Sequence, residues 1–255
     1  MSAATTAILY APGTNCHEET AAAIEAAGGR SELVLLHDLV AGITRLDRYE
    51  AAVIPGGFSY GDHLGAGRIF ATMLVAQLRD QLVEFLGAKK PLLGICNGFQ
   101  VLADAGILPG RTPGRRLMAL LENQSACFED RKVRLVVSPQ KSLWTEGLQG
   151  QVLEMPSAHG EGRPLFCLAS HPASRNSAPG ADTPRVAFRY VDSESRPTMH
   201  HPENPSGAPE AVAGITDESG MVLGLMPHPE RASLPVHYSQ DGLKLFRNLA
   251  RWLAR

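Results

Sequence analysis

The stretch Leu92-Leu93-Gly94-Ile95-Cys96-Asn97-Gly98-Phe99-Gln100 (LLGICNGFQ) decides the fold class of this chain. Its apolar start, LLGI (92–95), is typical of a strand buried on both faces. FQVLADA (99–105) follows at once and predicts a short helix that ends at Gly106. The cysteine between them has a glycine two residues away on each side, which indicates an unusual turn or a close backbone approach. The stretch therefore predicts a strand, a sharp turn at Cys96 and a helix.

The flanking sequence repeats this alternation of strand and helix. Apolar runs at 6–11, 33–36 and 51–54 read as strands, and helix-like segments cover 18–27 and 66–86. Strands that alternate with helices favour a mostly parallel sheet flanked by helices, an α/β fold of the flavodoxin-like kind.

The second half of the chain has a different pattern. Strands are predicted at 131–137, 186–191, 211–215 and 221–226 with no helices between them, and the chain closes with an amphipathic helix. We expect a single domain over residues 1–255, with a proline-rich excursion around 165–210. The buried stripe of the closing helix is predicted to consist of Leu243, Phe246, Leu249 and Leu253.

Composition excludes several functional classes. The chain has 255 residues, and its 24 basic and 26 acidic side chains leave a net charge of −2. No long basic run suggests a nucleic-acid partner, and no apolar run approaches the roughly 20 residues of a membrane span. The start of the chain lacks the features of a signal peptide. We therefore expect a cytoplasmic protein without a nucleic-acid or membrane partner.

The metal-ligating residue types form no recognisable metal site. Cysteines stand at 16, 96, 127 and 167, and no two have C-x-x-C spacing, so neither zinc nor a redox pair is indicated. The pair His200-His201 with Glu203 matches no standard metal cluster. We predict free thiols in a reducing compartment and no bound metal.

The cysteine of the opening stretch has the context of a nucleophile. Strand, turn and helix with G-x-C-x-G at the turn form the nucleophile-elbow pattern, with sulfur in place of oxygen. A thiol at a helix N-terminus is favoured as thiolate by the helix dipole. The alternative is an inert buried cysteine whose glycines serve packing. Cys16 also precedes a helix, but it lacks the flanking glycines.

Two further segments follow predicted strands and could complete a site. In PHPER (227–231), His228 lies between prolines, and Glu230, two residues on, could orient the imidazole. The pair Gly56-Gly57 could present backbone N–H groups to an oxyanion. Taken singly, these are equally consistent with a loop histidine and a glycine turn. Sites in open α/β sheets lie at the carboxyl ends of strands, which favours bringing these segments together.

Five blocks together carry a family resemblance. They are PGTNCHEET (12–20), PGGFSYGDHLGAG (55–67), GICNGFQVL (94–102), AHGEG (158–162) and LGLMPHPER (223–231). The cysteine block followed far downstream by PHPE resembles the class I (triad) glutamine amidotransferases. The whole set is similar to the glutaminase subunit family of phosphoribosylformylglycinamidine synthase, an enzyme of purine biosynthesis. The blocks span nearly the whole chain in the family's order.

The resemblance implies a role for each matched residue. Cys96 would attack the side-chain amide of glutamine, His228 would carry the proton to departing ammonia, and Glu230 would hold the imidazole. The backbone N–H groups of Gly57 and Asn97 would stabilise the oxyanion. The substrate-binding residues that it implies are Phe58, Gln100, Asn123, Ser125 and Phe128.

The resemblance also implies partners. The sequence has no G-x-x-x-x-G-K-[ST] motif, so we expect no cofactor in this chain. ATP and magnesium are expected on a large synthase subunit that receives the ammonia, and the resemblance also implies a third small subunit. AHGEG is expected near the pocket or the synthase interface, but chemistry assigns His159 no role. Residues 165–185 match no part of the family pattern.

Two other hypotheses remain open on the sequence. A DJ-1-like cysteine hydrolase would share the elbow, but such enzymes usually place histidine directly after the cysteine, where this chain has Asn97. A non-catalytic interaction subunit on the same scaffold would carry an unreactive thiol. The presence of both His228 and Glu230 argues against it.

Overall fold

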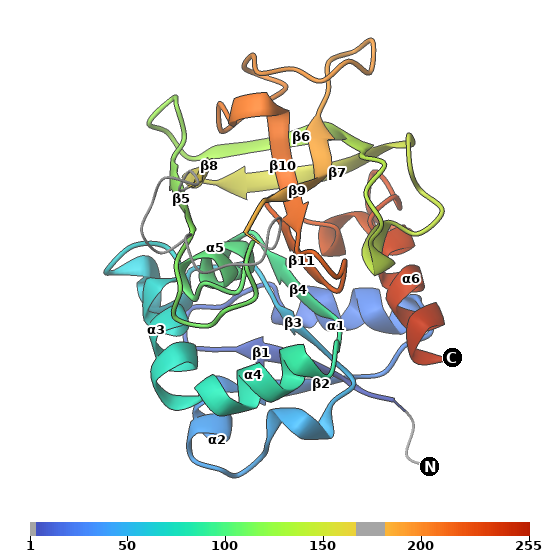
Figure 1. Ribbon diagram of the computed structural model, residues 1–255. Helices are drawn as coiled ribbons and strands as arrows, with labels where there is room; N and C mark the ends of the chain where they lie inside the picture. Colours follow the sequence, from blue (N-terminus) through green and yellow to red (C-terminus); the bar gives the residue numbers. More distant parts are fainter. Residues whose placement is uncertain (1–3, 167–181) are drawn as a thin grey trace.

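The computed structural model describes residues 4–166 and 182–255. Cys167 and most of the unmatched segment 165–185 lie outside the described residues. Within the described ranges, the main sheet has nine strands in the order β2-β1-β3-β4-β11-β10-β9-β6-β7, and β5 and β8 form a separate two-stranded sheet. Figure 1 shows helices around the lower part of the main sheet, with β6, β7, β9 and β10 above them.

One region of the main sheet is parallel. In it β2, β1, β3, β4 and β11 pair in parallel, and every residue of β3, β4 and β11 is buried. Buried parallel strands of this kind need helices on both faces of the sheet. The predicted α/β class is confirmed. The strands are β1 (Thr6–Tyr10), β2 (Ser31–Leu35), β3 (Ala51–Ile54), β4 (Leu92–Ile95) and β11 (Val222–Leu225).

The connections divide the helices between the two faces. The chain moves from β1 outward to β2 and later from β3 to β4 in the opposite direction, so right-handed crossovers place the connecting helices on opposite faces. Accordingly α1 packs with α6, and α3 packs with α5. The helices are α1 (His17–Ala26), α2 (Leu36–Val40), α3 (Arg68–Gln77), α4 (Arg79–Gly87), α5 (Asn97–Asp104) and α6 (Leu243–Leu253).

Glycines let α5 lie directly on the parallel strands. A Cβ atom on Gly98 would stand 1.9 Å from the carbonyl oxygen of Ile54 in β3. One on Gly94 would stand 2.6 Å from the carbonyl oxygen of Gly98, and one on Gly224 would stand 2.1 Å from the ring of Phe99. These distances are far below van der Waals contact. The glycines around Cys96 therefore serve the close backbone approach that the sequence indicated.

The second region of the sheet is antiparallel. β10 pairs with β11 and β9, and β6 pairs with β9 and β7, all antiparallel. Strand β9 falls inside the range of the predicted proline-rich excursion. The strands are β6 (Glu129–Val137), β7 (Val152–His159), β9 (Arg185–Tyr190) and β10 (Val212–Thr216), and the small sheet holds β5 (Met118–Glu122) and β8 (Glu161–Phe166).

The structure corrects two expectations from the sequence. The pattern at 66–86 predicts one helix, but α3 and α4 are separated at Leu78, whose φ of −124° and ψ of 14° leave the helical region. Leu78 is buried, so the break lets both helices turn apolar residues toward the core. Strands β5, β7 and β8 had no predicted counterpart. Pro156 lies inside β7, and such a proline is tolerated because β7 is an edge strand.

The remaining predicted elements agree with the structure to within a few residues. The closing helix buries Leu243, Phe246 and Leu249, and Leu253 packs against the core with part of its surface exposed. Among the described residues, no helix combines the length and apolar character that spanning a bilayer requires.

Candidate active site

The nucleophile elbow at Cys96 is present as predicted. Cys96 directly follows β4 and precedes α5, and its backbone has φ of 50° and ψ of −105°. A non-glycine residue in this region of φ is strained, and such strain concentrates at functional sites. The thiol is buried at 6% exposure and donates to the carbonyl oxygen of Ala158 at 3.4 Å. The sulfur thus stands at the N-terminus of α5, facing the end of β7.

His228 and Glu230 form a buried pair beside this thiol. His228 follows β11, and its Nδ1 lies 2.6 Å from Glu230 Oε1, with the side chains 2% and 0% exposed. The His228 backbone N–H donates to the Pro156 carbonyl oxygen at 2.7 Å, which ties this loop to β7. Because Nδ1–H donates to a carboxylate, Nε2 is the nitrogen left to exchange a proton. Within the described residues, Nε2 has no hydrogen-bond partner.

Electrostatics favour a protonated His228. Burial alone would lower its pKa, but the Glu230 carboxylate and the neighbouring thiols of Cys96 and Cys16 raise the pKa well above its ordinary value. An imidazolium beside a thiolate is the charge pairing that activates cysteine nucleophiles. The structure therefore brings Cys96, His228 and Glu230 together, although they are far apart in the sequence.

The two predicted oxyanion donors also lie at this place. Gly57 follows β3 with φ of 137°, and a Cβ atom there would lie 2.6 Å from the backbone nitrogen of Asn15, so only glycine fits. Phe58 N–H is used by the Gly13 carbonyl oxygen at 3.0 Å. In the described part of the chain, the N–H groups of Gly57 and Asn97 have no such acceptor. Both remain available to an oxyanion at Cys96.

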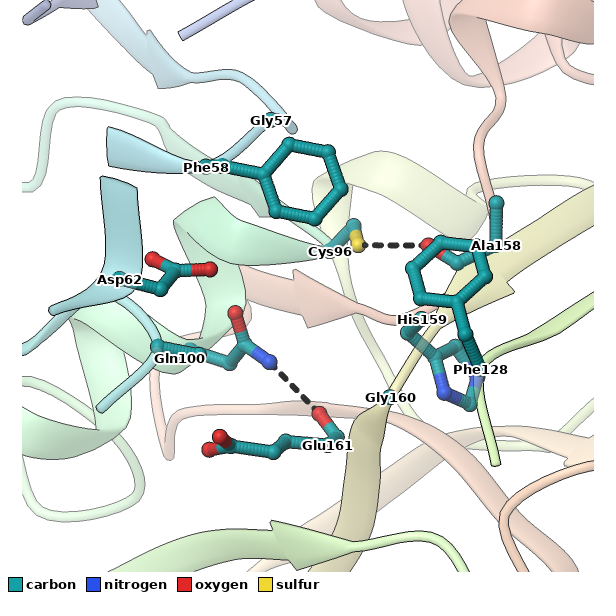
Figure 2. A pocket seen from close by; sticks show the side chains of 11 residues that line it. Gly57, Phe58, Asp62, Cys96, Gln100, Phe128, Ala158, His159, Gly160 and Glu161 are labelled. Carbon is teal, nitrogen blue, oxygen red and sulfur yellow. Dashed lines mark hydrogen bonds between the residues drawn. The ribbon is translucent and has the colours of Figure 1, made fainter. Parts of the chain in front are cut away.

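A cavity of about 130 Å³ opens in front of the thiol. Phe58, Gln100 and Phe128, three of the predicted substrate contacts, line it together with Cys96 and Gly57. Figure 2 shows the rings of Phe58 and Phe128 on either side of the sulfur, and their centroids lie 6.2 Å apart. About half of each ring is exposed, so the pair forms an apolar mouth over the nucleophile.

Polar side chains fix the opposite wall of this cavity. Asn97 Oδ1 accepts from Ser59 Oγ at 2.6 Å, and Asn97 Nδ2 donates to Asp62 Oδ1 at 3.1 Å and to Gln100 Oε1 at 3.0 Å. Gln100 Nε2 donates to the Glu161 carbonyl oxygen at 2.6 Å. This chain of bonds connects the loop after β3, helix α5 and the start of β8. Gln100 is thereby held in one orientation, one turn beyond Cys96.

The structure does not place Asn123 or Ser125 in this cavity. Asn123 is buried and binds the backbone behind it, donating from Nδ2 to the His159 carbonyl oxygen at 2.7 Å. Ser125 lines a different cavity, of about 280 Å³, together with Glu129 and His201. The segment ENQSACF therefore contributes Phe128 to the cavity at Cys96, while Asn123 supports its wall from outside.

The block AHGEG lies beside the pocket, as expected. His159, Gly160 and Glu161 line the cavity at the turn between β7 and β8. His159 Nδ1 pairs with Asn123 Oδ1 at 2.9 Å, and burial together with the nearby charge of His228 lowers the His159 pKa to about 4. His159 is thus a neutral wall residue that donates to Asn123.

Cys16 lies on the other side of His228. It lines a second small cavity of about 60 Å³ that also touches Cys96, His228 and Arg231. Arg231 Nη2 donates to Cys16 Sγ at 3.2 Å, yet burial raises the pKa of this thiol. Cys16 has neither an elbow backbone nor flanking glycines. The structure therefore favours Cys96 over Cys16 as the nucleophile.

The ligand atoms of Cys16, His228 and Glu230 lie within 4.8 Å of one another, close enough to consider a metal. The hydrogen bonds already described account for this cluster. His228 Nδ1 and Glu230 Oε1 share a proton, and the Arg231 guanidinium places a positive charge at the Cys16 sulfur. Proton transfer chemistry therefore explains this donor set without a metal.

A cysteine thiol at a nucleophile elbow, an imidazole held by a carboxylate and two free backbone donors are the arrangement of a cysteine amidohydrolase of the triad type. Residues 3–253 match the model of the CobB/CobQ-like glutamine amidotransferase domain, and the chain belongs to this family.

Individual members of the family and solved structures show which known proteins this chain is similar to. The chain is 39% identical over 242 residues to phosphoribosylformylglycinamidine synthase subunit PurQ of Methanococcus maripaludis, covering 93% of this chain and 85% of that protein. The PurQ subunit of a Nostoc species is 40% identical, with 95% of each covered. The solved structure of PurLQS from Thermotoga maritima superposes with a TM-score of 0.78 at 31% identity, over 98% of this chain and 99% of that one. A putative GMP synthase subunit of Thermoplasma acidophilum, 16% identical with a TM-score of 0.56, shares the fold.

Sequence reasoning missed the acidic wall of the cavity. Asp62 and Glu161 both line it, yet neither was singled out. Both lie inside quoted blocks, Asp62 at the end of PGGFSYGD and Glu161 in AHGEG. The signal that could have found them was two acidic residues in glycine-rich loops flanking the same predicted site.

Proposed function

We propose that this chain is the glutaminase subunit of a phosphoribosylformylglycinamidine synthase and that it releases ammonia from glutamine at Cys96. The similarity to PurQ subunits over nearly the full length supports the assignment. The observation that carries the chemistry is the convergence of the Cys96 thiol, the His228–Glu230 pair and two free backbone donors around one cavity.

The reaction proceeds in two halves. The Cys96 thiolate attacks the carboxamide carbon of glutamine, and the N–H groups of Gly57 and Asn97 stabilise the oxyanion that forms. The C–N bond breaks as His228 gives its proton to the departing ammonia, leaving a γ-glutamyl thioester. Water then attacks the thioester, His228 takes up a proton from it, and the C–S bond breaks to release glutamate and the thiolate. Glu230 orients the imidazole throughout.

The released ammonia is used by a partner, the synthase subunit. The synthase subunit uses ATP and magnesium to convert formylglycinamide ribonucleotide to formylglycinamidine ribonucleotide, and a third small subunit completes the complex. We propose that the reaction takes place in the cytoplasm. The similarity to the solved structure of PurLQS from Thermotoga maritima supports an assembly of this kind.

Mixing the purified chain with its synthase partner tests the proposal. Glutamate release should require glutamine, should rise when the partner is added, and should fall at least about 1,000-fold in Cys96→Ala and in His228→Ala. The reagent 6-diazo-5-oxo-L-norleucine should label Cys96. The matched control Cys127→Ala, an exposed cysteine, should keep full activity. Labelling at another residue, or an active Cys96→Ala variant, would overturn the assignment of Cys96 as the nucleophile. A wild type without glutaminase activity in the complex would leave the non-catalytic subunit as the better reading.

A further inference from the structure

Cys16 is a buried thiol that the proposed reaction does not use. It directly precedes α1 and is 1% exposed. Its sulfur, an imidazole nitrogen of His228 and a carboxylate oxygen of Glu230 lie within 4.8 Å of one another. A side chain this close to both members of the pair can determine how the pair is held, even though it does not attack the substrate.

Two hydrogen bonds orient this thiol. Cys16 Sγ donates to Asn15 Oδ1 at 3.3 Å and accepts from Arg231 Nη2 at 3.2 Å. Burial, as the largest cause, raises the pKa of Cys16, so the sulfur keeps its proton for the bond to Asn15. The neutral thiol therefore acts as an acceptor on its remaining sides, beside the His228–Glu230 pair.

Arg231 connects this thiol to the loop that carries the pair. It directly follows Glu230 in the chain, and its Nε lies 3.5 Å from Oε1 of Glu19 in α1. Burial alone would lower the Arg231 pKa, but the Cys16 sulfur and the carboxylates of both glutamates raise it, so the guanidinium stays charged. The segment before α1 and the loop after β11 are thus joined at the Cys16 sulfur.

Gly56, directly after β3, leaves room for both the sulfur and the imidazole. A Cβ atom on Gly56 would stand 2.7 Å from Cε1 of the His228 ring and 3.3 Å from Cys16 Sγ. The Cys16 N–H donates to the Gly56 carbonyl oxygen at 3.3 Å, which fixes the sulfur relative to the end of the strand. The sulfur and the ring edge that carries Cε1 therefore lie side by side over one glycine.

We propose that Cys16 is a positioning residue, whose sulfur keeps the imidazole of His228 turned toward the Cys96 thiol. This inference rests on the proposed glutaminase function and deepens it. The bond from Nδ1 to Glu230 holds one point of the ring, and the ring could still swing about that bond. The Cys16 sulfur, within hydrogen-bond reach of the imidazole, restricts this swing. Both thiols and His228 line one cavity of about 60 Å³.

Three substitutions of Cys16 test this role in the complex with the synthase partner. Cys16→Ser keeps a donor for Asn15 and an acceptor for Arg231, so its kcat for glutamine should stay within about threefold of the wild type. Cys16→Ala removes the sulfur, and Cys16→Val fills its space without a lone pair. Each should lower kcat by about 10- to 100-fold and change KM by less than about twofold, because the imidazole is misplaced while the substrate contacts remain. The matched control Cys127→Ala, which removes an exposed thiol, should keep the wild-type kcat.

The pH dependence separates positioning from mere packing. The titratable groups around the imidazole are Glu230, Cys96, Cys16 and His159. Burial lowers the His228 pKa, and Cys16 is one of the groups that raise it. Cys16→Ala and Cys16→Val should therefore move the basic limb of kcat/KM for glutamine to lower pH by about half a unit, and Cys16→Ser should not.

Thermal unfolding of all variants accompanies the kinetics. If Cys16→Ala alone fails to fold, the serine and valine variants, which both fill the site, decide the matter. A valine variant with the kcat and pH profile of the wild type would show that residue 16 only fills space and would overturn the inference. A serine variant as impaired as the valine variant would overturn it too. In either case an active wild type leaves the glutaminase function standing, whereas an inactive wild type would refute that function itself.

Discussion

The parallel and antiparallel regions of the sheet contribute different things to the site. The parallel region supplies the reacting atoms, because Cys96, His228 and Gly57 all follow its strands β4, β11 and β3. The antiparallel region and the small β5–β8 sheet supply much of the wall, with Phe128, Ala158 and Glu161. Reaction chemistry thus depends on backbone geometry at strand ends, whereas binding depends on side chains that border loops. The two kinds of contribution should respond differently to substitution.

The largest effect is expected where backbone geometry is tightest, in the parallel region. Gly98→Ala puts a Cβ atom 1.9 Å from the Ile54 carbonyl oxygen, so α5 must move away from β3. We expect a loss of about 3 kcal/mol or more in the free energy of unfolding, and loss of glutaminase activity because the elbow moves with the helix. Chemical denaturation and the activity assay measure the two effects.

Gly87→Ala is the matched control for this prediction. Gly87 ends α4, and a Cβ atom there would meet nothing within 4 Å. Its stability should stay within about 1 kcal/mol of the wild type, since alanine is the better helix former. If Gly98→Ala were as stable and active as Gly87→Ala, close packing of α5 would not position the nucleophile.

A loss of unfolding free energy of similar size, but dependent on pH, is expected for His159 in the wall of the cavity at Cys96. The folded state lowers the His159 pKa to about 4 from an ordinary 6.5, so the unfolded chain binds the proton more readily. The stability that a neutral His159 contributes is therefore complete above about pH 6.5 and lost as the pH falls toward 4. Between pH 7 and pH 4 this loss amounts to about 3 kcal/mol. His159→Gln should lack this component.

The measurement is the difference in unfolding free energy between wild type and His159→Gln at several pH values. His228 does not interfere, since its raised pKa contributes stability that is complete below about pH 6.5 and declines only above it. The acidic residues are the same in both proteins, so the effect of their titration on the unfolding free energy cancels in the difference. A difference that stays constant from pH 7 to pH 4 would show that folding does not lower the His159 pKa.

The success of the sequence-based predictions also differs between the parallel and antiparallel regions of the sheet. The strand-turn-helix at 92–105 and the strand ends that carry Gly57 and His228 were predicted because local patterns and glycine spacing dictate them. Strand β7 was missed because Pro156 argues against a strand unless one knows that it lies at an edge. Asp62 and Glu161 were missed because their place at one cavity depends on contacts among α5, the loop after β3 and β8. No local pattern encodes such contacts.

The smallest effect separates two neighbours in the segment ENQSACF. Phe128 lines the cavity at Cys96 and faces Phe58, whereas Ser125 lines a different cavity and accepts from the Cys127 N–H at 3.3 Å. Phe128→Ala should raise KM for glutamine by about three- to tenfold, since half of this ring is already exposed and only part of its apolar surface can be lost. Ser125→Ala, three residues away, should change KM by less than twofold. Steady-state kinetics on the two variants in the synthase complex decide the matter: a larger effect from Ser125→Ala would mean that the substrate extends into the second cavity and that the antiparallel region contributes more than a wall.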